Sequence, residues 1–76
     1  METITKEIVK YTSYRMKNGY EARVYDDKTI LIVTPNQFEW KINELPKHTR
    51  EIIQPLIEFL ENDLNHKFTI AENEIE

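Results

Sequence analysis

Carboxylate side chains are the residues of this 76-residue chain with the most potential for chemistry, and they are concentrated near its C-terminal end. Glu58, Glu61 and Asp63 lie close together in sequence, and two such carboxyl groups could act as a general acid and a general base. Such a pair needs at least one carboxyl group whose pKa is raised by burial. The polar stretch "EFLENDLN" instead predicts exposed carboxylates with ordinary pKa values. Acid–base catalysis is therefore not expected.

Nucleophilic, metal and phosphate chemistry are also unfavoured by the residue types. The chain has no cysteine and one serine, Ser13, which lies in a predicted strand without the G-x-S-x-G surroundings of a hydrolase. His48 and His66 lie at opposite ends of a predicted helix, whereas transition-metal sites need about three or four converging ligands. The single glycine cannot build a phosphate-binding loop. We expect a protein that is not an enzyme, with no catalytic residues, no metal and no cofactor.

Binding is a more suitable role for the carboxylates. Residues 44–76 contain three Lys/Arg and eight Asp/Glu, a net charge of −5, whereas residues 1–43 contain seven and six, a net charge of +1. Such asymmetry is an argument about partners and solubility. The predicted acidic surface consists of Glu51, Glu58, Glu61, Asp63, Glu72, Glu74 and Glu76. It would attract a basic partner protein, and the alternative is a solvated helix face followed by a solvated tail.

A second candidate surface is the basic and aromatic hairpin within residues 10–28. Its candidate binding residues are Tyr11, Tyr14, Arg15, Lys17, Tyr20, Arg23 and Tyr25. Tyrosines on a sheet can stack on bases while Lys and Arg neutralise phosphates. The net charge of −4 argues against nucleic acid, because nucleic-acid modules usually carry a positive field. The alternatives are half-buried, strand-forming tyrosines, or exposed tyrosines that serve as apolar anchors beside the acidic surface.

The hairpin itself is predicted from Asn18-Gly19, which favours a two-residue type I′ turn. With that turn, Arg15 lies opposite Ala22 and Tyr14 lies opposite Arg23. Neither face is then cleanly apolar, which favours a hairpin that extends beyond the core.

Two further strands and a helix complete the predicted elements. The run "TILIV" (29–33) predicts a central strand, and "FEWKI" (38–42) places Phe38, Trp40 and Ile42 on one face. Apolar residues then recur at helical spacing up to Leu64. Pro55 predicts either a kink near 51–55 or a short helix joined to a main helix that starts at Pro55.

These elements predict an α+β fold, an antiparallel β-meander of about four strands packed against one C-terminal helix. The helix should end at Asn65-His66, and "KFTIAE" (67–72) is a candidate for a short fifth strand. We expect one domain over residues 1–76, with fraying of 66–76 as an open alternative. The longest apolar run, Ile30 to Val33, is far shorter than the ~20 residues of a membrane span. The lack of cysteine and of a signal-peptide pattern favours the cytoplasm.

In size, Lys/Asn/Ile/Glu-rich composition, lack of cysteine and the acidic run "EFLENDLN…AENEIE", the chain resembles small host-takeover proteins of phages that infect low-GC Gram-positive bacteria. Some proteins of that class are acidic DNA mimics that block host DNA-binding proteins, including the nucleoid protein HU. The resemblance implies a non-enzymatic inhibitor in the cytoplasm of a bacterial host cell. Its partner would be a host protein with a basic, DNA-binding surface, and it would bind neither nucleic acid nor membrane itself.

Two alternatives to this function stay open. One is a small nucleic-acid-binding module that uses the Tyr/Arg/Lys hairpin within residues 10–28. The other is a small homodimeric structural protein, and both a monomer and a homodimer are compatible with the sequence.

Overall fold

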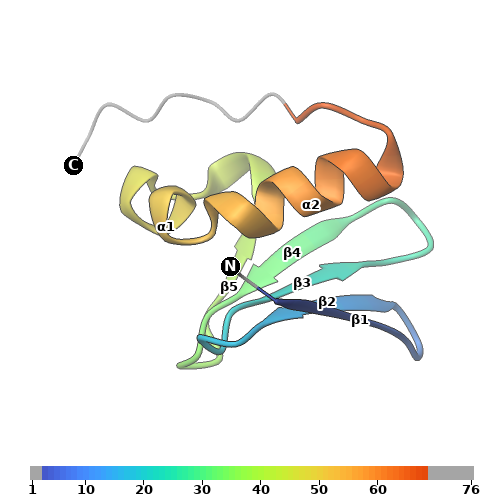
Figure 1. Cartoon of the computed structure of the whole chain (residues 1–76), viewed down its shortest axis with the longest axis horizontal. Coiled ribbons are helices and arrows are strands. Elements are labelled where there is room, and N and C mark those ends of the chain that lie inside the picture. The colour runs from blue at the N-terminus through green and yellow to red at the C-terminus, as the bar shows by residue number, and fades with distance from the viewer. Residues whose placement is uncertain (1–2, 69–76) are drawn as a thin grey trace.

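The chain folds into a five-stranded antiparallel sheet with its helices on one face (Figure 1). The computed structural model describes residues 3–68. The strands lie in sequence order and are β1 (Ile4–Ile8), β2 (Thr12–Met16), β3 (Glu21–Val24), β4 (Ile30–Val33) and β5 (Glu39–Lys41). A short 3₁₀ helix, η1 (Ile42–Glu44), leads into α1 (Lys47–Ile52) and α2 (Gln54–Leu64). The predicted α+β meander with a C-terminal helical layer is confirmed.

The fifth strand lies at the N-terminus, where no strand was predicted. β1 is an edge strand that pairs with β2 and is largely exposed. Its sequence, ITKEI, has charged residues at its centre, as edge strands often do, so it shows no apolar run. Of the predicted strand over 67–72, Lys67 and Phe68 are in no strand, and 69–72 lie outside the described residues.

All three hairpins that join β2 to β5 use the same three-residue loop. In the first loop Gly19 N–H donates to Met16 O at 3.2 Å and Met16 N–H donates to Tyr20 O at 2.8 Å. The third loop residue has a positive φ each time, and these residues are Gly19 (98°), Lys28 (76°) and Gln37 (68°). A three-residue loop with a left-handed third residue matches the twist of the flanking strands.

The predicted register of the first hairpin is therefore wrong by one residue. Tyr14 pairs with Ala22, and Arg15 pairs with Glu21. The loop contains Lys17 as well as Asn18-Gly19, and a slip of one residue moves side chains to the opposite face of the sheet. As a result, Tyr14 and Ala22 lie together in the core, and the hairpin does not extend beyond it.

The helical layer follows the second of the two predicted arrangements. α1 ends at Ile52, and Pro55 lies in the first turn of α2, where its missing N–H is not needed. The Ile53 N–H between the helices donates to Thr49 O at 3.1 Å. α2 ends as predicted at Asn65, which adopts the left-handed conformation at φ 53°.

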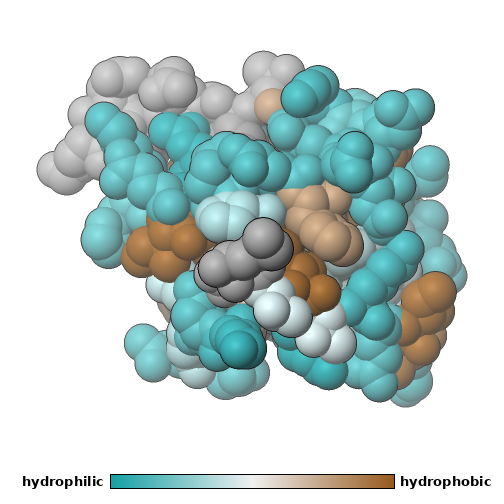
Figure 2. Space-filling model, viewed as in Figure 1, coloured by the Kyte–Doolittle hydropathy of each residue, from teal (hydrophilic) through white to brown (hydrophobic). Residues whose placement is uncertain are grey.

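The core lies between the helical layer and the facing side of the sheet. Its buried residues are Tyr14, Met16, Ala22, Ile32, Leu45, Ile53, Leu56, Ile57 and Leu60. Trp40 and Ile42 pack against its margin as predicted, but Phe38 is 57% exposed and contacts Trp40 edge to face. In the view of Figure 2, hydrophobic residues form separate patches on a mainly hydrophilic surface.

Candidate binding surfaces

Glu51 and Glu58 are the two members of the predicted acidic surface that the structure exposes to solvent without an ion pair among the described residues. Glu51 is on α1 and Glu58 is on α2. The Glu58 carboxylate accepts a hydrogen bond from Gln54 Nε2 at 3.3 Å, one helical turn earlier. Both side chains therefore present negative charge from the helical layer.

Glu61 is used inside the molecule. Its Oε2 accepts a hydrogen bond from the Phe68 backbone N–H at 3.0 Å, and its Oε1 lies 3.7 Å from Lys67 Nζ. Only 17% of the Glu61 side chain is exposed. This carboxylate therefore fixes the chain that leaves α2 and contributes little charge to the surface.

Asp63 is also used inside the molecule, where it joins α2 to the first two strands. Its Oδ2 accepts a hydrogen bond from Lys6 Nζ on β1 and another from Tyr14 Oη on β2, each at 2.7 Å. The hydrogen bonds from Lys6 and Tyr14 hold the pKa of Asp63 below its ordinary value. Burial, and then the contact with Asp63, raise the pKa of the Tyr14 hydroxyl well above its ordinary value.

The other predicted acidic residues, Glu72, Glu74 and Glu76, lie outside the described residues. Residues 3–68 contain 10 Lys/Arg and 10 Asp/Glu, so their formal net charge is 10 − 10 = 0. The whole chain has 14 Asp/Glu. The net charge of −4 therefore comes from Glu2, Glu72, Glu74 and Glu76.

The predicted hairpin surface is divided between the two faces of the sheet. Tyr14 is buried in the core at 1% exposure, so it cannot serve as an exposed anchor, and Tyr20 is half-buried against the core. Arg15 and Lys17 are exposed, and the Arg15 Nη2 pairs with Glu7 Oε1 at 3.0 Å. The prediction of Tyr14 as a binding residue is wrong, because the register places it on the side of the helices. Tyr11, Tyr20 and Tyr25 are half-buried.

The remaining hairpin residues form a compact group on the opposite face, which we call the open-face cluster: Tyr11, Ser13, Glu21, Arg23 and Tyr25. The Tyr11 and Tyr25 ring centroids are 5.1 Å apart, and the Arg23 guanidinium lies 5.0 Å from the Tyr11 ring centroid. Arg23 Nε donates to Glu21 Oε1 at 3.1 Å, and the buried Ser13 hydroxyl donates to Glu21 Oε2 at 2.5 Å.

The charges of this cluster are balanced internally. Burial alone would lower the pKa of Arg23, but hydrogen bonding to Tyr25 and the nearby Glu21 carboxylate raise it overall. Ser13 and Glu21 were not among the predicted binding residues, because the predicted register places Tyr14 opposite Arg23, whereas the observed register pairs Ser13 with Arg23. The cluster offers two tyrosine rings and one paired guanidinium to a partner.

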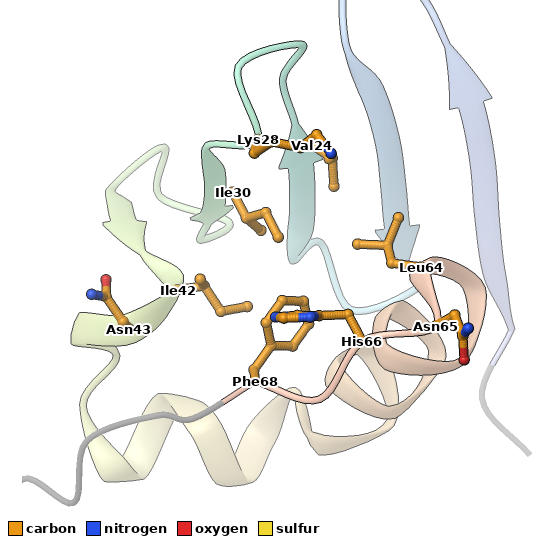
Figure 3. Close-up of a pocket in the computed structure, with 9 residues that line it drawn as sticks. All are labelled: Val24, Lys28, Ile30, Ile42, Asn43, Leu64, Asn65, His66 and Phe68. Carbon is orange, nitrogen blue, oxygen red and sulfur yellow. The ribbon is translucent and has the colours of Figure 1, made fainter.

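A cavity of about 680 Å³, which we call the end pocket, lies where α2 ends beside the sheet (Figure 3). It is lined by Val24, Lys28, Ile30, Ile42, Asn43, Leu64, Asn65, His66 and Phe68. The His66 and Phe68 rings meet edge to face with centroids 5.3 Å apart. No sequence motif predicted this site, since its residues come from distant parts of the chain.

Within residues 3–68, no three His, Cys, Asp or Glu residues come together in a way that could hold a metal ion. None of the helices in this range is long and apolar enough to cross a membrane.

The chain was compared with protein-family models, with curated proteins and with solved structures. No family model, no curated protein and no solved structure matches it. Its function must therefore be inferred from its own residues and their geometry.

Proposed function

We propose that this protein is a non-enzymatic binding protein that presents the acidic side of its helical layer to a basic protein partner. The observation that carries the proposal is the division of charge between the two layers. Residues 3–41 contain seven Lys/Arg and five Asp/Glu (7 − 5 = +2), and residues 42–68 contain three and five (3 − 5 = −2). Within residues 3–68 the two layers therefore carry opposite formal charge, and Glu51 and Glu58 are exposed on the negative layer.

Binding accounts for the described side chains better than catalysis does. Ser13 is 2% exposed, and its hydroxyl donates to Glu21 rather than facing solvent. Asp63 has a lowered pKa, which is the wrong direction for a general acid near neutral pH. Charge on an exposed helix needs no such tuning to attract a partner.

The finer form of the proposal concerns the partner. Carboxylates on a rigid helix, followed in sequence by Glu72, Glu74 and Glu76, would occupy a cleft that normally takes phosphates. A bacterial DNA-binding protein is the partner that fits this chemistry, and the phage-protein resemblance suggests the nucleoid protein HU. The protein would then act as an inhibitor that competes with DNA.

Affinity for purified HU, measured at low and high salt with and without competing duplex DNA, tests both forms of the proposal. We expect binding at low salt that weakens with added salt and with DNA. Reversing Glu51 and Glu58 together to lysine should weaken binding about tenfold, because rim charges each contribute up to about 1 kcal/mol. Glu39→Lys on β5 is the matched control, since Glu39 is exposed on a different layer.

The outcomes separate the two forms. If the protein does not bind HU but still captures another basic protein from bacterial lysate in a salt-sensitive way, only the finer form of the proposal is refuted. Unchanged affinity of the double-reversal variant for its partner would refute the role of the helical layer.

A second candidate function is nucleic-acid binding by the open-face cluster. It is favoured by the Arg23 guanidinium, which lies over the Tyr11 ring at 5.0 Å, and by the neighbouring Tyr25 ring, since bases stack on aromatic and guanidinium groups. Fluorescence anisotropy with single-stranded and duplex oligonucleotides tests it. Binding that is lost in a Tyr11→Leu, Tyr25→Leu variant would favour this function, and an unaltered anisotropy with the wild-type protein would eliminate it.

A further inference from the structure

The end pocket has the size and lining of a small-molecule site. Its volume of about 680 Å³ falls in the range of roughly 300–1,000 Å³ that is typical of ligand pockets. Its apolar walls come from three places in the fold: Val24 and Ile30 on the sheet, Ile42 on η1, and Leu64 and Phe68 at and beyond the end of α2. Figure 3 shows these side chains around one hollow.

Four polar groups of the described residues line this hollow. They are the Lys28 ammonium, the Asn43 and Asn65 amides and the His66 imidazole. The Lys28 ammonium is a cation, and the two amides both donate and accept hydrogen bonds. Among residues 3–68, none of the nine lining residues is a carboxylate, although this range has as many Asp/Glu as Lys/Arg, 10 of each. The described part of the lining therefore carries the Lys28 cation and no carboxylate, which favours an anion.

Lys28 has an unusual backbone conformation at this position. It is the left-handed third residue of the β3–β4 loop, at φ 76°, where glycine would be less strained. The loop holds it there through the hydrogen bond from Lys28 N–H to Tyr25 O at 3.0 Å. The neighbouring Asp27 carboxylate accepts from the Thr29 N–H at 3.0 Å, so it is engaged within the turn.

We propose that the end pocket binds a small amphipathic anion, with an apolar chain of about eight carbons among the aliphatic walls and an anionic head group at Lys28. The head group is a carboxylate or a phosphate, which share the chemistry that the Lys28 ammonium recognises. This inference rests on the pocket alone and is independent of the proposed protein partner.

Titration of the full-length ¹⁵N-labelled protein with octanoate tests the proposal, with amide chemical shifts as the readout. We expect saturable shifts at Val24, Lys28, Asn43 and His66, and none at open-face residues such as Arg15. Octyl phosphate in a parallel titration shows which head group is preferred. Octyltrimethylammonium, which has the opposite charge, should bind at least about fivefold more weakly.

Two substitutions on exposed side chains change the charge of the rim with little risk to folding. Lys28→Gln removes the ammonium, and Asn43→Asp adds a carboxylate of nearly the same shape. Each should weaken octanoate binding about fivefold and leave binding of neutral 1-octanol unchanged. Lys41→Gln and Asn36→Asp make the same charge changes outside the pocket lining and should have no effect.

Three results would overturn the proposal. The first is an absence of octanoate-induced shifts at the pocket residues. The second is an equal loss of octanoate and 1-octanol binding in Lys28→Gln and Asn43→Asp, which would show that the rim charge is not recognised. The third is a response of the pocket to a synthetic peptide of residues 69–76 but not to octanoate, which would assign it to the chain's own C-terminal segment.

Discussion

We expect the hydrogen bond between Tyr14 and Asp63 to stabilise the attachment of the helical layer to the sheet. Tyr14 is 1% exposed, and its hydroxyl donates to Asp63 Oδ2 at 2.7 Å. Tyr14→Phe removes only the hydroxyl, and Asp63→Ala removes both carboxylate oxygens that could accept from it. The two changes and their combination form a double-mutant cycle that isolates this hydrogen bond.

The expected magnitude follows from the geometry. A hydrogen bond to a charged group contributes about 1.5–3 kcal/mol to stability. The Asp63 side chain is 33% exposed, so water competes for it and we expect about 1–2 kcal/mol for Tyr14→Phe. In a domain of this size about 1 kcal/mol corresponds to a shift in Tm of about 4–8 °C. Lys6, which is 42% exposed, adds only about 0.2–1 kcal/mol.

Urea denaturation at pH 7 of the wild type, both single variants and the double variant gives the coupling free energy. We expect about 1 kcal/mol. Tyr14→Phe combined with Glu58→Gln is the control, because Glu58 shares no hydrogen-bond partner with Tyr14, and this pair should be additive within about 0.3–0.5 kcal/mol. A Tyr14–Asp63 coupling no larger than that of the control would refute the attachment.

The pH dependence gives the same test a second readout. The folded-state pKa of Asp63 is lowered by the hydrogen bonds from Lys6 and Tyr14. The resulting stability is fully present above the unfolded pKa of about 3.9 and is lost as the pH falls through the folded value. The stability difference between wild type and Asp63→Ala should therefore shrink as the pH falls below about 4. A difference that stays constant from pH 7 to pH 2 would contradict this assignment.

Three smaller changes test other local features. Gln37→Gly should raise the free energy of unfolding by about 0.5–1 kcal/mol. The left-handed conformation costs most residues about 1–2 kcal/mol, and relief of this cost is partly offset because glycine makes the unfolded chain more flexible. Urea denaturation measures the change, and a decrease would contradict the loop assignment. Glu61→Ala should increase amide hydrogen exchange at Phe68 about fivefold, and unchanged exchange would show that the carboxylate does not hold this segment. Ser13→Ala should lower the free energy of unfolding by about 1 kcal/mol, because Glu21 loses a buried hydrogen bond, and a loss below about 0.3 kcal/mol would argue against that bond.

The sequence was most informative where one periodicity persists over several residues. The alternation around Trp40 and the helical spacing up to Leu64 predicted a strand and a helix correctly, and Pro55 predicted the division of the helical layer. The register of the first hairpin was not predictable from Asn18-Gly19 alone. A glycine with positive φ fits both two-residue and three-residue loops, and these differ by one residue in pairing.

The candidate site was harder to predict than the fold, because its key contacts join distant segments. A helical wheel gives the direction of Asp63 on α2, but its partners Lys6 and Tyr14 are 57 and 49 residues away in sequence. Lys6 lies on β1, a strand that lacks an apolar pattern. The end pocket was missed for the same reason, since nothing in the local sequence links Lys28 to His66.

The structure changes what the acidic residues can do for a partner. Asp63 joins α2 to the sheet and Glu61 fixes the segment after α2, so removing them would alter stability as well as charge. Residues 3–68 are neutral overall, and their field is that of two layers with opposite charge. Under the proposed function, a partner that approaches from far away would respond mainly to the net charge, which comes from outside this range, and a docked partner would respond to Glu51 and Glu58. Association rate and final affinity should therefore depend on different carboxylates, and a substitution in one group need not affect the other quantity.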